Sequence, residues 1–180
     1  GTARDYPLYK VRGLILDVGR KTFSMDWLRQ MSQELSWYKM NDFQVHLSDN
    51  YIWVEEYTNE TIDQAYSGFR LESDVKAGGN GGLNKADLTS TDVFYTKDEF
   101  RQFITDSRAM GVNVVPEFDM PAHSLALTKV RPDLRTPTSA TRRGNDHLNL
   151  LGDKYDDSLA FALSIWDEYT TGENPVFDAQ

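Results

Sequence analysis

Residues 11–20 read VRGLILDVGR, in which residues 14–16 and residue 18 are all apolar and the last position is charged. Successive side chains of a strand point to opposite faces, so an unbroken apolar run indicates a strand that is covered on both faces. Such strands are typical of parallel sheets, where helices cover the faces. We therefore predict a buried parallel strand over residues 13–18.

An amphipathic helix is predicted directly after this strand. Ser24 is placed to cap the first amide groups, and Asp26 falls in the first turn, where the helix dipole favours negative charge. Apolar side chains then recur at helical spacing, at Leu28, Met31, Leu35 and Tyr38.

A second strand and a second helix repeat this order. Alternation of Phe43, Val45 and Leu47 with polar residues predicts a strand that ends near residues 46–49. The second helix begins much later, where Thr96 and Glu99 form a capping box, with Phe100, Phe103, Ile104 and Met110 as its apolar residues. The stretch between them, about residues 50–95, is a long inserted loop, and loops of this length are usually functional or mobile.

The third unit begins after Gly111, which ends the second helix. Val112, Val114 and Val115 predict a strand that runs to Phe118. A last helix is predicted from about Asp156, with its apolar side formed by Leu159, Ala162, Leu163, Trp166 and Tyr169.

Alternation of strands and helices predicts an α/β fold with a parallel sheet. Two architectures share this order: an open doubly wound sheet and the first units of a (β/α)8 barrel. A doubly wound nucleotide-binding fold normally has several glycines in the first strand-to-helix turn. Residues 17–24, DVGRKTFS, contain one, which weakens that alternative.

The composition excludes several classes of function. Lys and Arg total 19 against 28 for Asp and Glu, and the net charge of -9 argues against nucleic acid or an anionic membrane surface as the main partner. There is no cysteine, so disulfides, thiolate catalysis and cysteine zinc sites are excluded while the redox compartment stays undetermined. No apolar run approaches the roughly 20 residues that span a bilayer, and residues 1–10 lack the apolar core of a signal peptide.

Polar side chains follow all three predicted strands. They fall in residues 17–20, 46–50 and 117–123, at the edge where parallel sheets and barrels bind ligands. Taken singly, Arg20 is equally well explained as a partner in a surface salt bridge. His46 lies between apolar neighbours, and we interpret it as an interior histidine in preference to a ligand contact.

Other chemistries at this edge are less well supported. His46, Asp49, Asp119 and His123 are acceptable metal ligands by type, yet no H-x-x-x-H or EF-hand spacing is present, so we predict no metal site. A serine nucleophile is also disfavoured, because the G-x-S-x-G elbow is absent. Acid-base chemistry is the better hypothesis, and Pro121 predicts a rigid turn that aims the imidazole of His123.

Three motif blocks, in this order, resemble glycoside hydrolase family 20. They are VRGLILDVGR at 11–20, SWYKMNDFQVHLSDN at 36–50 and VNVVPEFDMPAHS at 112–124. The resemblance covers most of the chain and implies the N-terminal portion of a catalytic (β/α)8 barrel, with about the first three βα units. It also implies a retaining exo-β-N-acetylhexosaminidase, in which the 2-acetamido group of the substrate is the nucleophile.

The resemblance assigns roles to four residues. Arg20 matches an arginine that holds hydroxyl groups of the terminal sugar, for which its fork of donors is suited. Asp49 and His123 match a pair that supports the acidic glutamate and tunes its proton affinity. Asp119 matches an aspartate that braces this network at the substrate, and a purely structural role for it is equally open.

The chain departs from the family pattern at two points. Ala122 stands where the family more often has glycine, which restricts the turn before His123. More seriously, no Gly-x-Asp-Glu follows a fourth strand, so we expect the 180 residues alone to be inactive. Asp167-Glu168 is not a substitute, because it falls in a helical pattern and is expected on a solvated face.

The tryptophans give a weaker prediction. Three of them, Trp27, Trp37 and Trp166, fall in predicted helices and are interpreted as packing residues. Only Trp53, in the long loop, is a candidate for contact with substrate.

The expected partner is therefore a glycan with a terminal N-acetylhexosamine, and no cofactor is expected. A lacto-N-biosidase, a noncatalytic carbohydrate-binding module and a structural fragment remain alternatives. We expect an extracellular or cell-surface location, with any export signal outside these residues. Because an open barrel exposes strand edges, association into a homo-oligomer is also expected.

Overall fold

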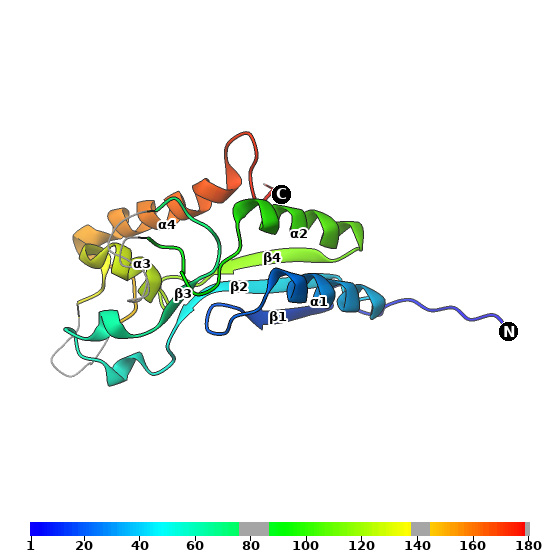
Figure 1. Ribbon diagram of the computed structural model, residues 1–180, viewed down its shortest axis with the longest axis horizontal. Helices are drawn as coiled ribbons and strands as arrows, with labels where there is room; N and C mark the ends of the chain where they lie inside the picture. The colour runs from blue at the N-terminus through cyan, green and yellow to red at the C-terminus, as the bar shows by residue number, and fades with distance from the viewer. Residues whose placement is uncertain (76–86, 138–144, 179–180) are drawn as a thin grey trace.

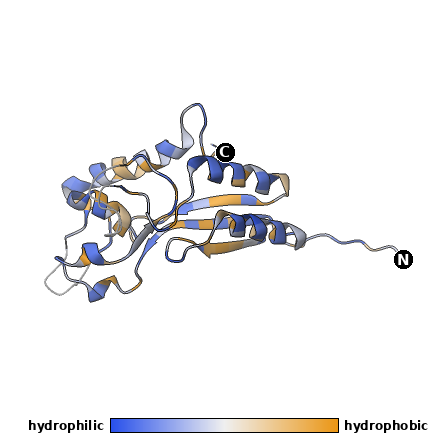
Figure 2. Cartoon of the chain, in the orientation of Figure 1, coloured by the Kyte–Doolittle hydropathy of each residue, from blue (hydrophilic) through white to orange (hydrophobic). Residues whose placement is uncertain are grey.

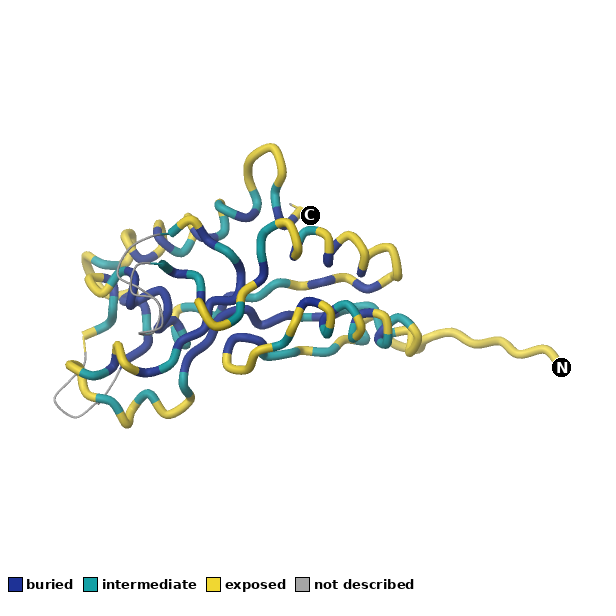
Figure 3. Tube along the Cα trace, in the orientation of Figure 1, coloured by how far each residue is buried: buried dark blue, intermediate teal, exposed yellow. Residues whose placement is uncertain are grey.

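The computed structural model describes residues 1–75, 87–137 and 145–178. Its centre is a sheet in which β2 (Asp42–Asn50) lies between β1 (Gly13–Asp17) and β4 (Asn113–Phe118), parallel to both (Figure 1). Residues 1–10 extend away from this body and are exposed (Figure 3). The three predicted strands and their parallel pairing are therefore confirmed.

Two helices lie side by side over one face of this sheet (Figure 1): α1 (Met25–Trp37) and α2 (Lys97–Ala109). Their first turns are fixed as predicted, because Ser24 accepts from the amide of Trp27 and Thr96 forms a complete capping box with Glu99. Gly111 follows α2 with a φ of +81°, a conformation that favours glycine.

Apolar residues of strands and helices meet between these two layers. Phe43 and Val45 of β2 are fully buried, and the ring of Phe43 packs edge-on against Phe103 of α2. Figure 2 shows hydrophobic and hydrophilic residues alternating around the helices, and Figure 3 shows the buried residues concentrated along the central strands. Burial of these apolar side chains is the main source of stability.

The long loop after β2 carries structure that its length did not predict. A short strand, β3 (Ser67–Phe69), pairs antiparallel with residues 48–50 of β2. Two 3-10 turns, at Val54–Glu56 and Ile62–Gln64, precede it. Within its described part the segment is therefore a folded extension of the sheet, and residues 76–86 of the predicted loop lie outside the described residues.

Two helices lie at the carboxyl ends of the strands (Figure 1). α3 (Leu125–Val130), which the sequence did not predict, is buried at all of its residues and contacts β2 and β3. α4 (Tyr155–Thr170) begins close to the predicted residue, and further 3-10 turns occupy Pro132–Leu134 and Gly152–Lys154.

The predicted apolar face of the last helix is right only in part. Tyr169 is buried and Trp166 packs against the core, as predicted, but Leu159 and Leu163 are 41% and 52% exposed. The other buried positions of α4 are Ser158, Phe161 and Ile165. Apolar residues occur around most of this helix, so periodicity alone did not identify the packed side. Tyr38 and Met110 were also assigned to packed helix faces, but both are C-caps and exposed.

An aromatic cluster joins α4 to the end of β4. The rings of Phe69 and Phe118 stack with their centroids 4.8 Å apart. The rest of the cluster packs around Phe118 at centroid distances of 5.2 to 6.4 Å, from Trp166, Tyr169 and Phe177. This cluster holds Phe118, the last residue of β4, against β3 and α4.

The second face of the sheet is open over β1 and β4. Ile15 is 65% exposed and Val115 is 38% exposed on this face. β4 pairs with β2 along one edge, and no other described strand pairs with its second edge. Among the described residues no helix is long and apolar enough to cross a membrane.

Candidate functional site

Three of the predicted site residues come together at the carboxyl ends of the parallel strands. Arg20 follows β1, Asp49 lies near the end of β2, and His123 follows β4. Arg20 Nη2 is 2.7 Å from one carboxylate oxygen of Asp49, and His123 Nδ1 is 3.0 Å from the other. One carboxylate therefore joins residues that are 103 positions apart in the chain.

Arg20 is held in place along its whole guanidinium group. Its Nε donates to the carbonyl of Asn50 at 3.1 Å, and its Nη1 donates to Asp17 at 2.9 Å. The backbone amide of Arg20 donates to the same aspartate at 2.9 Å. With 32% of its side chain exposed, Arg20 is a preorganised group of donors at the surface.

Asp49 is the buried centre of the cluster. It is 2% exposed and also accepts a hydrogen bond from its neighbour, the amide of Asn50, at 2.7 Å. Burial raises the pKa of its carboxyl group, but the hydrogen bonds from His46 and Asn50 and the charge of Arg20 outweigh this effect and hold the pKa of Asp49 below its usual value. Asp49 is therefore an anion that fixes its cationic neighbours.

His46 is an interior residue, as predicted, and it bridges two carboxylates. Its Nε2 is 2.8 Å from Asp49, and its Nδ1 is 3.2 Å from Glu117 of β4. Gln44, which lies two residues before His46 on the same face of β2, also donates to Glu117. The hydrogen bond to Asp49, helped by Glu117, raises the pKa of His46 to about 9 despite its burial.

We expect His46 to carry a proton at neutral pH. Because its pKa is raised from 6.5 to about 9 by folding, its stabilising contribution is complete below pH 6.5 and disappears as the pH rises through 9. Nuclear magnetic resonance titration of the imidazole Hε1 protons measures this directly.

Glu117→Gln provides the matched comparison for that titration, since it removes one of the two anionic partners of His46 and keeps a side chain of similar size. The midpoint of His46 should fall in this variant. A wild-type midpoint at or below 6.5 would show that the bridge between the two carboxylates is absent in solution.

The backbone around His123 is held by two residues that the sequence did not predict. His123 has a φ of +56°, unusual for a residue with a side chain, and its amide donates to Asp146 at 3.1 Å. Asn50 donates to the same carboxylate oxygen at 3.1 Å and accepts from the amide of Leu125. Asn50 directly follows Asp49 at the strand end, which was a usable signal, whereas no motif marked Asp146.

Asp119 lies at the margin of the cluster. One of its carboxylate oxygens and one ligand atom each of Asp49 and His123 all lie within 4.8 Å of one another. Its backbone carbonyl accepts from the hydroxyl of Ser124, which closes the turn after β4, and the same hydroxyl donates to Ala122. The structure thus places Asp119 where it was predicted and leaves its role untested.

A metal ion is poorly matched to these ligands. By residue type, the Asp49, Asp119 and His123 group and the Asp17, His46 and Asp49 group are both able to offer ligand atoms. Both depend on Asp49, whose oxygens already face the guanidinium of Arg20 and the protonated ring of His46. A cation there would be repelled by two positive charges.

The residues considered for other roles lie outside this cluster. Glu168 is not on a solvated face: its side chain is 12% exposed, and it accepts from the hydroxyl of Ser73 and pairs with Lys97 at 2.9 Å. Its neighbour Asp167 is exposed, as predicted.

Two of the three helical tryptophans pack as predicted. Trp27 and Trp166 lie against the core, whereas Trp37 is 69% exposed, so the packing role predicted for it is wrong. Trp53 is 54% exposed in the segment after β2.

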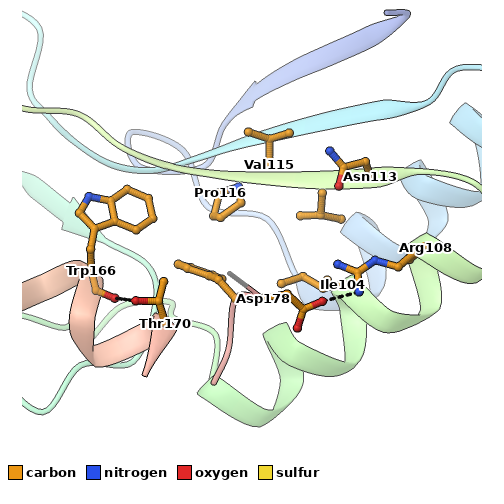
Figure 4. Close-up of a pocket in the computed structure, with 10 residues that line it drawn as sticks. Ile104, Arg108, Asn113, Val115, Pro116, Trp166, Thr170 and Asp178 are labelled. Atoms are coloured by element: carbon orange, nitrogen blue, oxygen red, sulfur yellow. Dashed lines mark hydrogen bonds and ion pairs between the residues drawn. The ribbon is translucent and has the colours of Figure 1, made fainter. Parts of the chain in front are cut away.

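A separate cleft of about 320 Å³ lies along the free edge of β4 (Figure 4). It lies between α2 and α4 and is lined by residues that include Ile104, Pro116 and Trp166. None of Arg20, Asp49 and His123 contributes to it. The cleft is therefore a feature of the open sheet and not of the cluster.

Comparison with known proteins decides the family. The profile described as "Glycosyl hydrolase family 20, catalytic domain" matches residues 9–171, which include the whole cluster. The chain belongs to glycoside hydrolase family 20. The resemblance that the three motif blocks carry is thereby confirmed.

Relatives within the family agree with this assignment. A β-N-acetylhexosaminidase of Cellulomonas fimi is 33% identical over 135 residues, covering 74% of this chain and 24% of the relative. A β-hexosaminidase of Vibrio furnissii is 28% identical over 144 residues, covering 72% of the chain and 21% of the relative. The chain thus spans about a fifth to a quarter of the length of these relatives.

Solved structures of family 20 proteins share the fold. A chitobiase of Flavobacterium johnsoniae matches with a TM-score of 0.67 and 25% identity, over 91% of this chain and 22% of that protein. A β-N-acetylhexosaminidase of Streptomyces coelicolor A3(2) matches with a TM-score of 0.61 and 26% identity, over 93% of this chain and 32% of that protein. These neighbours place the chain in a family of (β/α)8 barrels, and its own sheet is open.

Proposed function

We propose that this chain is the N-terminal part of the catalytic barrel of an exo-β-N-acetylhexosaminidase. The observation that carries the proposal is the joining of Arg20, Asp49 and His123 by one buried carboxylate at the ends of three parallel strands. The relatives' names, β-hexosaminidase and β-N-acetylhexosaminidase, favour release of a single terminal sugar over release of a disaccharide.

The proposed reaction is a retaining hydrolysis assisted by the substrate. The 2-acetamido oxygen of the terminal sugar attacks the anomeric carbon while an acidic glutamate protonates the leaving oxygen, and water later opens the cyclic intermediate. Within this chain, Arg20 binds hydroxyl groups of that sugar through its exposed donors. Asp49 and His123 hold the acidic glutamate by hydrogen bonding and tune its proton affinity, and Asp119 braces them.

The acidic glutamate and the aspartate that orients the acetamido group are not among these residues. The chain alone is therefore proposed to bind the sugar without cleaving it. Incubation with a chromogenic β-N-acetylglucosaminide tests this point, and release of the chromophore by the purified chain would contradict it.

Titration with N-acetylglucosamine tests the sugar site itself. We expect saturable, millimolar binding by the chain and loss of saturation in Arg20→Ala, since one arginine supplies the charged hydrogen bonds to the sugar. Arg29→Ala is the matched control, because Arg29 also pairs with an aspartate three residues away but lies on α1. Equal affinity of the wild type and Arg20→Ala would refute the proposed role of Arg20.

A further inference from the structure

Arg70 is a fully buried arginine that neither the motifs nor the proposed reaction uses. It follows β3 directly and is 0% exposed. Its Nε donates to the carbonyl of Val18 at 2.7 Å, and its Nη2 donates to the carbonyl of Gly19 at 3.0 Å. These are the two carbonyl groups that immediately precede Arg20 in the chain.

The other end of the Arg70 guanidinium is anchored in the loop before α2. Its Nη1 donates to Asp92 at 2.6 Å and to the carbonyl of Val93 at 3.0 Å. Tyr66 contacts Nη2 of Arg70 and donates to the second oxygen of Asp92 at 2.9 Å. A buried cation is costly unless it is paired and hydrogen-bonded. Each of the three guanidinium nitrogens of Arg70 has such a partner.

Two glycines bring the turn before Arg20 close enough for this contact. A Cβ atom on Gly68 of β3 would lie 2.2 Å from the carbonyl oxygen of Gly19, and one on Gly19 would lie 2.7 Å from the amide nitrogen of Asp49. Both contacts are to backbone, which cannot move aside as a flexible side chain can. The peptide before Arg20 is therefore enclosed between β2 and β3, with Arg70 fixing its carbonyl groups.

We propose that Arg70 is a positioning residue for Arg20: it fixes the turn from which Arg20 reaches Asn50, Asp49 and the sugar. The fork geometry explains why arginine occupies the position, because one planar group satisfies two successive carbonyls and an aspartate at once. A lysine is able to replace the charge but not these simultaneous contacts. The proposal rests on the sugar-binding role proposed for Arg20.

The test follows the Nε–H group of Arg20, which donates to the carbonyl of Asn50 and is observable in a protein labelled with ¹⁵N-arginine. Its resonance is assigned by its loss in Arg20→Ala. In Arg70→Lys we expect its hydrogen exchange to accelerate by about tenfold, as for the loss of hydrogen bonds to a charged group, and the affinity for N-acetylglucosamine to fall toward that of Arg20→Ala.

Arg101→Lys is the matched control. Arg101 likewise holds two backbone carbonyls, those of Asn174 and Pro175, and an aspartate, but it does so on α2. This variant should lose stability without changing the exchange of the Arg20 Nε–H. If Arg70→Lys does not fold, Tyr66→Phe removes one partner of Arg70 and should accelerate the exchange to a smaller extent.

The two proposals fail in different ways. Unchanged exchange and affinity in a folded Arg70→Lys would overturn the positioning role, as would unchanged exchange in Tyr66→Phe where that variant has to be used. Unchanged affinity in Arg20→Ala would instead overturn the sugar-binding role of Arg20. The exchange of its Nε–H would still decide whether Arg70 fixes the turn.

Discussion

Asp49→Asn should lower the free energy of unfolding by about 3–5 kcal/mol at pH 7, the size of loss expected when one partner of a buried ion pair is removed. Asp49 is 2% exposed and is the anion for Arg20, His46 and His123. An asparagine keeps the shape but leaves the cation of His46 facing a neutral amide in the interior. The pKa of His46 should fall in the same variant, because its hydrogen bond to Asp49 is the main cause of the raised value.

Urea unfolding followed by circular dichroism measures the first effect, and the imidazole titration measures the second. Asp17→Asn is the control, because Asp17 also pairs with Arg20 but is 34% exposed, and exposed pairs contribute about 0–1 kcal/mol. Equal losses of unfolding free energy in Asp49→Asn and Asp17→Asn would mean that burial of Asp49 has no energetic consequence.

Phe118→Ala should lower the free energy of unfolding by about 3–5 kcal/mol, the range for removing a buried aromatic ring from a packed core. Phe118 is 6% exposed, and its ring packs against Phe69 of β3 and Tyr169 of α4. Its removal would leave a cavity between these elements and the segment at Phe177.

Val115→Ala is the control on the same strand. Val115 points to the open face and is 38% exposed, so its loss should change the free energy of unfolding by less than about 1 kcal/mol. Thermal and urea unfolding of both variants test the difference. A cost below about 1 kcal/mol for Phe118→Ala would show that the aromatic cluster is loosely packed.

The parts of the fold that depend on local chemistry were predictable from the sequence. The strand at 13–17 and the capped starts of α1 and α2 lie where the apolar run, Ser24 and Thr96 indicated them. α3 was missed because it has 6 residues and Ser124 makes no side-chain cap. Such a helix is stabilised by tertiary burial and leaves no periodic signal.

Part of the site was predictable because the carboxyl ends of parallel strands lie at the same edge of a sheet. Arg20, Asp49 and His123 were expected at one edge because parallel strands end there, and the structure brings them within hydrogen-bonding distance. The residues that hold these three in place were not predictable, since Asp146 and Arg70 lie outside every recognised motif. Their importance comes from tertiary contacts with backbone groups, which sequence patterns do not record.

Other expectations remain predictions. Neither an extracellular location nor association through the open edges of the sheet is tested by the structure or by the relatives. The catalytic roles of Asp49, His123 and Asp119 likewise depend on the acidic glutamate that the proposal places outside these residues.

The order of the parallel strands has a consequence for synthesis. β1, β2 and β4 lie across the sheet in the order in which a ribosome would release them, so each parallel strand meets a neighbour that already exists. Chains are made at about 5–20 residues per second, slower than strands pair, so early pairing can precede the release of later segments. Thus β2 pairs with an edge of β1, and β4 with an edge of β2, that is already present when the later strand is released.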